Sequence, residues 1–561
     1  MNRYICIHGH FYQPPRENPW LEEIELQDEV YPFHDWNERI NAECYSQNAA
    51  SRVLDERGKI ARIINNYSFM SFNFGPTLLS WLESKAPDTY QAIIDADRDS
   101  RERFSGHGSA IAQAYNHTIL PLSSERDKET QVIWGIRDFE RRFGRRPEGM
   151  WLPETAVDVE SLETLAKFGI IFTILAPHQA KRVRRRGDRA WRDITGSGVD
   201  TSKPYTCLLP SGNSISLFFY NGAAARAVAF EGILKNGYDF AHRLLSAFNH
   251  ENSEPQLSHI ATDGESYGHH HRFGDMALAY ALSHIEDNGL ARITNYSEYL
   301  EMNPPDHEVE IVENTSWSCS HGLERWRANC GCNSGEHPEW NQEWRAPLRA
   351  TFDWLRSEID PLYESRGSAL FRDPWQARNE YIDVVLDRSR DNVDEFLGRN
   401  SAGDRSDDSD VSRLKLLEMQ RNAMLMYTSC GWFFDELSEV QTIQVIRYAG
   451  RTVQLAQEAF GNNYERRFLN RLEKAVSNRK SYKNGRLIFK EHVKPSMLDL
   501  THVGAHYAVS SLFEDYPEDT SIYCYKVKQE SRNALRSGRT KLAVGRAVIS
   551  SDVVWESTEI S

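Results

Sequence analysis

The stretch LSHIATDGESYGHHH, residues 257–271, decides the fold, because an apolar run ends abruptly in ionisable side chains. Residues 257–262 predict a buried strand. Asp263 follows at its end, and Gly264 and Gly268 permit a tight turn, since glycine adopts positive φ without steric cost. Two acids, an aromatic residue and three histidines share this loop. A strand that ends in such side chains predicts a ligand site at the edge of a parallel sheet.

Short apolar runs of this kind recur through roughly the first 300 residues. Further short apolar runs predict strands at residues 4–8, 69–73, 149–152, 171–175 and 215–219. Helical patterns lie between several of them, for example at residues 128–143 and 159–168. Strands separated by helices predict a parallel sheet with right-handed crossovers, which is either a barrel or a doubly wound sheet.

Polar residues at the strand ends distinguish these two folds. They are His8, His10, Asn73, Glu154, His178, Asn221 and Asp263. In a (β/α) barrel the chemistry lies at the carboxyl ends of several strands, whereas a doubly wound sheet gathers its ligands at one switch point. Polar ends on this many strands favour the barrel.

The sequence pattern changes after about residue 300. Helices are predicted at residues 345–357, 375–386, 412–428, 439–460 and 464–476, and strands at 486–489, 522–527 and 541–549. The polar run RNSAGDRSDDSD, residues 399–410, predicts a mobile loop. The chain stops soon after a strand-like run, which leaves open whether it is a piece of a longer protein.

These changes divide the chain into three expected parts. We predict a barrel domain over residues 1–310, a helical domain that completes the site over 311–480, and a β-rich segment over 481–561.

Composition restricts the class of protein. The formal charge is −15 and no basic face is visible, which argues against a nucleic-acid partner. No apolar run is long enough to span a bilayer. The N-terminus begins with a strand-like run rather than a secretory leader, and eight cysteines are sparse for 561 residues. We therefore expect a cytoplasmic protein; its oligomeric state is not readable.

Two further motifs place hydrogen-bonding groups near strand ends. The run HGHFYQPP, residues 8–15, follows the first strand, and WLPE, residues 151–154, delivers a carboxylate where Pro153 stops the strand. A third segment, residues 106–121, adds Asn116 and His117. Taken singly, each motif is also compatible with an ordinary loop.

Taken together and in order, four segments resemble signature regions of glycoside hydrolase family 57. They are residues 10–14, residues 116–121, residues 151–154 and residues 263–268, and the resemblance covers about residues 4–275. The remainder, with SCSHG at 318–322 and CGWFF at 430–434, resembles an uncharacterised extension found in one branch of that family.

The resemblance implies an incomplete (β/α)7 barrel followed by a helical domain. It also implies action on α-glucans with retention of configuration, by an α-amylase, a 4-α-glucanotransferase or a branching enzyme. By motif match, Glu154 occupies the nucleophile position and Asp263 the acid/base position. His10 and Trp151 match sugar-contacting positions.

Retention needs one ionised and one protonated carboxyl, about 5–5.5 Å apart, on opposite faces of the sugar. Attack gives a covalent glycosyl-enzyme. Water then completes hydrolysis, or a sugar hydroxyl completes transfer, and the sequence does not decide between them.

The chain also departs from the family pattern. The second signature region usually carries a glutamate soon after its opening glycine, but residues 108–113 read GSAIAQ. The arginine–aspartate pair often found before the acid/base residue is absent from residues 220–222. These differences leave the particular glucan and acceptor open.

Substrate contacts are predicted from the barrel and from the segment that follows it. Glu265 is expected to tune Asp263 or hold its loop. For most tryptophans core packing is the commoner role. The full set of predicted substrate-contact residues is His10, Gln13, His117, Trp151, Glu265, His269, Trp317, His321 and Trp432.

No cofactor and no metal is predicted for the reaction. The pattern Cys319-x-His321…Cys330-x-Cys332 could bind zinc in a closed site, although its spacing is unusual and reduced, buried cysteines in a loop are the alternative. Three adjacent histidines at 269–271 point in different directions, which makes a shared ion awkward.

Two other functions remain as alternatives. One is a metal-dependent carbohydrate deacetylase or α-mannosidase-like enzyme, which His8, His10 and residues 269–271 would allow. The other is a non-catalytic glucan-binding protein, against which the presence of both carboxylates argues.

Overall fold

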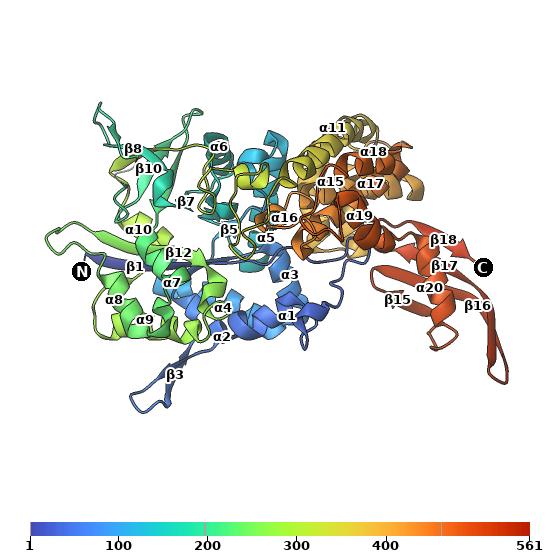
Figure 1. Ribbon diagram of the computed structural model, residues 1–561, viewed down its shortest axis with the longest axis horizontal. Helices are drawn as coiled ribbons and strands as arrows, with labels where there is room; N and C mark the ends of the chain where they lie inside the picture. Colours follow the sequence, from blue (N-terminus) through green and yellow to red (C-terminus); the bar gives the residue numbers. More distant parts are fainter. Residues whose placement is uncertain (1, 196–197, 462) are drawn as a thin grey trace. The chain divides into compact units, whose positions relative to one another are not determined.

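The computed structural model describes residues 2–195, 198–461 and 463–561. The chain forms two compact units (Figure 1). The first contains Met1–Pro15 and Leu26–Leu323, and the second contains Arg16–Glu25 and Glu324–Ser561.

The first unit is built around parallel strands. β1 (Arg3–Phe11) pairs in parallel with β12 (Gln256–Asp263) on one side and with β4 (Ser71–Phe74) on the other. A parallel bridge between Phe72 and Ala110 leads from β4 toward the next strand. These central strands are almost fully buried, as expected for a parallel sheet covered by helices.

The circuit continues through four more strands. β5 (Ala112–Gln113) pairs with β6 (Met150–Trp151), a bridge from Gly149 to Phe172 reaches β7 (Phe172–Leu175), and β7 pairs with β11 (Ser214–Phe219). The Asn221 backbone N–H then donates to the His259 carbonyl at 2.8 Å, which links the end of β11 to β12. The strand order β1, β4, β5, β6, β7, β11, β12 confirms the predicted (β/α)7 barrel.

Helices connect the strands, and their ends follow ordinary capping chemistry. α5 (Glu125–Phe143) begins where the Ser124 side chain accepts from the Asp127 N–H, and it ends at Gly144, whose φ is +65°. α6 (Val159–Lys167) begins at Asp158 in the same way. The other connecting helices of the first unit are α3 (Pro76–Lys85), α4 (Pro87–Arg103), α7 (Gly222–Phe230), α8 (Gly237–Leu245) and α9 (Gly274–Asp287).

Sequence patterns did not predict an antiparallel extension of this sheet. β10 (Tyr205–Leu208) pairs with β11, and β14 (His307–Ile311) pairs with β8 (Ala180–Arg185). The ion pair between Arg184 and Glu308 lies across the β8–β14 pair. β14 brings the chain back beside the barrel immediately before residues 313–323.

The second unit begins with helices, as predicted. The long helices are α11 (Arg345–Leu370), α15 (Asp407–Leu425) and α17 (Val440–Phe460). α11 continues well beyond the predicted residue 357. The shorter helices are α12 (Pro374–Glu380), α13 (Ile382–Leu386), α14 (Arg390–Asn400), α16 (Cys430–Phe433) and α18 (Tyr464–Leu472).

The loop predicted at residues 399–410 is shorter in the structure, because only residues 401–406 lie between two helices. α14 ends at Asn400 and α15 already begins at Asp407. The Ser406 side chain accepts from the Ser409 N–H, and three aspartates occupy the first turn of α15, where the helix dipole favours negative charge. The acidic run is therefore a helix start rather than a disordered segment.

The strand predicted at residues 486–489 was wrong. α19 (Gly485–Ile488) begins there, because the Asn484 side chain accepts from the Leu487 N–H. A further helix, α20 (Leu500–Ser510), follows. The β-rich part of the chain therefore begins later than the predicted residue 481.

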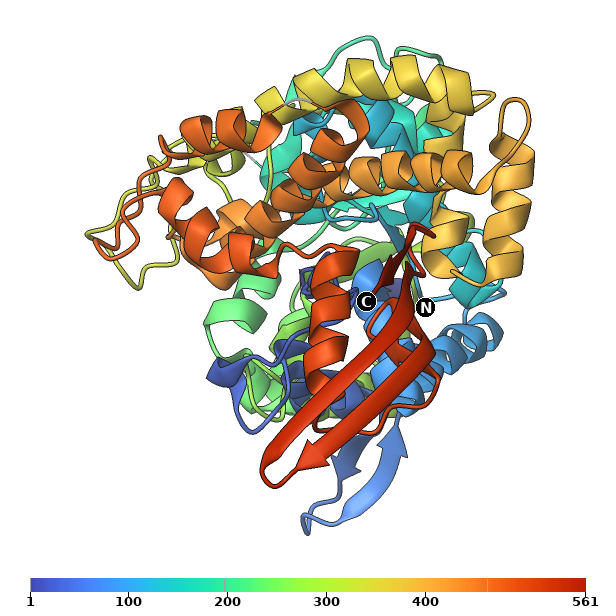
Figure 2. The same ribbon diagram turned by 90° about the vertical axis from the view of Figure 1, so that its right-hand side faces the viewer.

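Four antiparallel strands complete the second unit in the order β15 (Asp519–Ile522), β16 (Tyr525–Ser537), β17 (Thr540–Ser551) and β18 (Ser557–Ile560). The β16–β17 hairpin lies beside α20 (Figure 2). Leu500 and Val503 of α20 share a core with Val527 and Ile549 of the sheet. Within the described residues, no helix combines the length and the apolar character needed to cross a membrane.

Candidate active site

The register of the parallel strands brings polar residues together at their carboxyl ends. His10 lies opposite Asp263 in the β1–β12 pair and opposite Asn73 in the β1–β4 pair. Gln113 lies opposite Trp151 in the β5–β6 pair. The barrel therefore gathers at one end side chains that are far apart in the sequence, as the barrel fold requires.

Glu154 lies in a strained turn directly after β6. Its φ is +58°, and the φ of Thr155 is +49°. Left-handed conformations of such residues cost about 1–3 kcal/mol each and persist only where the surroundings impose them. The turn is fixed because the Thr155 carbonyl accepts from Gln179 Nε2 at 2.8 Å and the Glu154 carbonyl accepts from the Trp317 N–H at 3.0 Å.

The buried Glu154 carboxylate accepts hydrogen bonds from Trp317 and Ser318. Glu154 Oε2 accepts from the Trp317 indole Nε1 at 3.0 Å and from Ser318 Oγ at 2.5 Å. Donors of this kind stabilise negative charge and fix the direction of a carboxylate. The segment after the barrel strands thus completes the surroundings of Glu154.

Asp263 lies at the end of β12 in a different environment. The residue has exposed surface, but protein surrounds its carboxyl group closely enough that lost hydration raises its pKa to about 7. The negative charge of Glu154 adds to this rise. The two carboxyl groups are therefore near enough to interact, and one of them is partly protonated at neutral pH.

Glu265, two residues further, is buried and held by its neighbours. Its Oε1 accepts from Tyr45 Oη at 2.6 Å and from the Tyr12 N–H at 3.0 Å. Burial raises the pKa of Glu265 to about 8, the Tyr45 hydrogen bond opposes the rise, and the charge of Asp263 adds to it. These contacts show Glu265 anchoring the loop after β12. The sequence does not predict the contacts of Tyr12 and Tyr45 with Glu265, because nothing in the neighbouring residues indicates these partners.

A buried histidine network lies beside the carboxylates. His10 Nε2 and His117 Nε2 are 3.1 Å apart, and Asn73 contacts both His8 and His10. Burial lowers the pKa of His8 and of His10 to about 3 and lowers that of His117 well below its usual value. The network is therefore neutral at physiological pH, and its rings are hydrogen-bonding groups rather than cations.

Aromatic stacking fixes the orientation of these rings. His10 stacks on Trp151 with ring centres 4.9 Å apart, and His117 stacks on Tyr12 at 3.8 Å. Trp317 meets Trp151 edge to face at 5.1 Å. The structure thus brings together His10, His117, Trp151 and Trp317, four of the predicted substrate-contact residues.

Gln113 ends the stretch in which the family's usual acid is missing. Its Oε1 accepts from Asn73 Nδ2 at 2.8 Å, which joins it to the histidine network. Among the described residues, Gln113 Nε2 and Trp151 Nε1 are buried donors that have no acceptor. Each can therefore donate to a water or a sugar hydroxyl.

The remaining predicted contacts lie in other surroundings. Gln13 Nε2 donates to the Tyr12 carbonyl at 2.9 Å, and His269 Nδ1 lies 2.5 Å from Glu43. Trp432 belongs to the second unit, where it is 1% exposed and meets Phe352 edge to face. For Trp432 the structure favours the packing role.

His321 is the remaining predicted contact. It is exposed and lies in a cluster with Cys319, Cys330 and Cys332.

Comparison with known proteins identifies the family. The sequence profile of glycosyl hydrolase family 57 matches residues 5–312, more than half of the chain. The chain belongs to glycosyl hydrolase family 57. A domain of unknown function, DUF3536, matches residues 340–561, which confirms that this family member carries the uncharacterised extension.

Solved structures of the family share the fold. An exo-type maltose-forming amylase from Pyrococcus sp. ST04 superposes with a TM-score of 0.64 at 15% identity, over 90% of this chain and 95% of that one. A family 57 type branching enzyme from Pyrococcus horikoshii gives a TM-score of 0.51 at 16% identity, over 89% and 96% of the two chains.

A curated relative, alpha-amylase 1 of Dictyoglomus thermophilum, is 28% identical over 107 residues. The alignment covers 19% of this chain and 15% of the amylase. Membership of glycosyl hydrolase family 57 supports an enzyme of the glycoside hydrolase type.

Proposed function

We propose that this enzyme cleaves or transfers α-glucan chains by double displacement, with Glu154 as nucleophile and Asp263 as general acid/base. The observation that carries the proposal is the contrast between the two carboxyl groups. Trp317 and Ser318 donate to Glu154, while lost hydration and the Glu154 charge raise the pKa of Asp263 to about 7. One group suits an anion and the other a proton donor, which is the division of roles that retention needs.

The reaction then has two steps. The Glu154 carboxylate attacks the anomeric carbon, and the Asp263 proton passes to the glycosidic oxygen as the bond to it breaks. The glycosyl group is now an ester of Glu154. Asp263, now ionised, takes a proton from water or from a sugar hydroxyl, whose oxygen displaces Glu154 and releases the product.

The neutral histidine network supplies substrate contacts in this proposal. His10 and His117 are uncharged, and a neutral imidazole both donates and accepts hydrogen bonds. Their stacking on Trp151 and Tyr12 keeps the rings in fixed orientations. Gln113 Nε2 and Trp151 Nε1 add donors that a sugar hydroxyl can satisfy.

The metal-dependent alternative is disfavoured by the arrangement of its proposed ligands. His269 is paired with Glu43, His271 Nε2 lies 3.2 Å from the Ala229 carbonyl, and His10 contacts Asn73 and His117. In the part of the chain that the structure describes, these histidines do not converge into a group able to hold an ion.

Product analysis on maltooligosaccharides tests the proposal. Shorter products alone indicate hydrolysis, products both shorter and longer indicate transfer, and new branch points indicate branching. Proton NMR of the first-formed product should show the α-anomer, and initial formation of the β-anomer would contradict retention. An absence of turnover on every α-glucan, in protein shown to be folded, would favour the binding-protein alternative.

A cytoplasmic location is part of the same proposal, because the low cysteine content suits a reducing compartment. Cell fractionation followed by immunoblotting tests it; recovery of the protein outside the cytoplasmic fraction would contradict it.

A further inference from the structure

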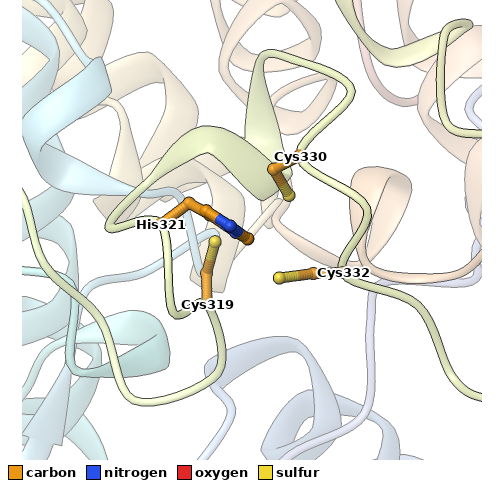
Figure 3. Close-up of side chains that lie close together, drawn as sticks. All are labelled: Cys319, His321, Cys330 and Cys332. Atoms are coloured by element: carbon orange, nitrogen blue, oxygen red, sulfur yellow. The ribbon is translucent and has the colours of Figure 1, made fainter.

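Four metal-binding side chains converge in one continuous stretch of the chain, residues 319–332. They are Cys319, His321, Cys330 and Cys332, and each offers one ligand atom such that all four atoms lie within 4.8 Å of one another. The sulfur atoms and the imidazole face a common centre (Figure 3). No step of the proposed glycosidase reaction uses these residues.

The backbone of this stretch turns at two glycines. Gly322 has a φ of +83°, and a Cβ added there would lie 2.4 Å from the Asn314 carbonyl oxygen, so only glycine fits. Gly331, between two of the cysteines, has a φ of +80°. This left-handed conformation turns the backbone between Cys330 and Cys332, whose sulfur atoms lie together in the cluster.

Hydrogen bonds hold the second cysteine pair in place. Arg345 Nη1 donates to the Cys332 carbonyl at 3.0 Å and Nη2 to the Phe434 carbonyl at 3.0 Å. Directly after this pair, the Ser334 N–H donates to the Asp435 carboxylate at 2.9 Å. These contacts hold the backbone at residues 332–334 beside residues 434–435.

The charges around the cluster suit thiolates. The Arg345 guanidinium lies within electrostatic range of the Cys330 and Cys332 thiols and of Arg325. Three thiolates, one neutral imidazole and a divalent cation together carry one negative charge. The nearby charged groups are Arg345, Arg325 and Asp435, which together carry one positive charge and therefore compensate it.

We propose that Cys319, His321, Cys330 and Cys332 bind one Zn²⁺ ion in a closed, structural site. Three sulfur ligands and one nitrogen are a set that zinc prefers in tetrahedral geometry. With Zn–S bonds of about 2.3 Å, neighbouring sulfurs in a tetrahedron are about 3.8 Å apart. The observed limit of 4.8 Å means that the ligand atoms need to approach by about 1 Å or less.

The ion would stabilise the stretch rather than take part in chemistry. Four protein ligands leave no open coordination position for water or a sugar. Cys319 follows Ser318, which holds the Glu154 carboxylate. The ion would therefore fix the segment that positions the nucleophile, without contacting the substrate.

Metal analysis of the purified full-length chain tests the proposal. After expression with added Zn²⁺ and exhaustive dialysis, mass spectrometry of the elements should find about one zinc per chain. The double substitution Cys330→Ser with Cys332→Ser should reduce this to near zero. The matched control is Cys524→Ser, which removes a thiol that is also partly buried and lies outside the cluster.

Two further measurements keep the test decisive if the double variant folds poorly. His321 is exposed, so His321→Ala should keep its circular dichroism spectrum and yet bind zinc on the order of tenfold or more weakly. Replacement of zinc by Co²⁺ should give the visible absorption of tetrahedral thiolate coordination. A folded wild-type chain that retains no zinc and gives no such Co²⁺ spectrum would overturn the proposal, as would full zinc content in the cysteine variant.

Discussion

The barrel site and the cluster at residues 319–332 are assembled in opposite ways. The barrel site takes its residues from strands far apart in the sequence, and the sheet register places His10 opposite both Asn73 and Asp263. The cluster takes its four residues from one short loop, and two glycines turn its backbone. Strand pairing holds the first site together, whereas the proposed zinc ion would hold the second together. The two sites should therefore respond very differently to substitution and to chelation.

The largest expected effect is on the nucleophile. Glu154→Gln removes the attacking carboxylate but keeps the shape of the side chain, so turnover on an α-glucan should fall on the order of 10⁴-fold or more. Zinc content should stay unchanged. Reducing-sugar release in steady state measures the effect, with Glu125→Gln, an exposed glutamate at the start of α5, as the charge-matched control. Residual turnover above a few per cent would remove Glu154 from this role.

The next effect is on the acid/base. Asp263→Asn should lower turnover of an α-glucan roughly 10²–10⁴-fold, because an unprotonated sugar is a poor leaving group. With an aryl glycoside whose phenol leaves without protonation, formation of the glycosyl-enzyme should be far less affected. Equal losses on both substrates would indicate a positioning role instead.

The pH dependence should show the same group. The first step needs protonated Asp263, whose pKa is raised to about 7, so kcat/KM should fall above about pH 7 and approach a tenfold loss per pH unit. Glu154 acts as an anion and does not produce this alkaline decline. A kcat/KM that stays constant from pH 6 to pH 9 on an unactivated glucan would contradict the assignment.

A smaller effect is expected at the carboxylate's hydrogen-bond donors. Ser318→Ala removes the bond from Oγ to Glu154 Oε2, and a hydrogen bond to a charged group contributes about 1.5–3 kcal/mol, so kcat should fall roughly 10- to 100-fold. Ser320→Ala, two residues away and exposed, is the control. An unchanged kcat in Ser318→Ala would mean that the Ser318 hydrogen bond is not needed to hold the carboxylate.

Chelation should have the smallest effect on turnover. If zinc is structural, its removal should lower the thermal midpoint while kcat at room temperature falls less than about tenfold, since the ion acts only through the position of Ser318. A catalytic metal would instead give nearly complete loss that added Zn²⁺ restores. That outcome would support the metal-dependent alternative. It would also mean that the cluster at residues 319–332 takes part in catalysis rather than only stabilising the fold.

Much of the barrel was predictable because its strands are apolar and end in polar residues. The run from Leu257 to Asp263 predicted both β12 and a functional side chain at its end. The segment at 407–410 was misjudged for a local reason, since aspartates next to a serine favour a helix start as readily as a disordered loop. The turn at Asn484 misled in the same way, because one capping side chain outweighed an apolar run that resembles a strand.

The site was less predictable than the fold, because its contacts cross long stretches of sequence. The sequence predicts a substrate contact for Trp317 and none for Ser318, but in the structure both side chains donate to Glu154, more than 160 positions earlier. Tyr45 meets Glu265 across 220 positions. Such pairings depend on how the segments cross in space, and residue type alone carries no signal for them.

The turn at Glu154 and Thr155 has a consequence for how this enzyme can be altered. Thr155 is held at positive φ, so this position lowers the free energy of unfolding below what a less strained residue would allow. Glycine at residue 155 would relieve that strain, but it would also remove a fully buried side chain and increase the conformational freedom of the turn. The same change would allow the Glu154 carboxylate to adopt more than one orientation. Strain at Thr155 lowers stability but keeps the Glu154 nucleophile in place. Variants selected for higher thermal stability through a change at residue 155 should therefore have a lower catalytic rate.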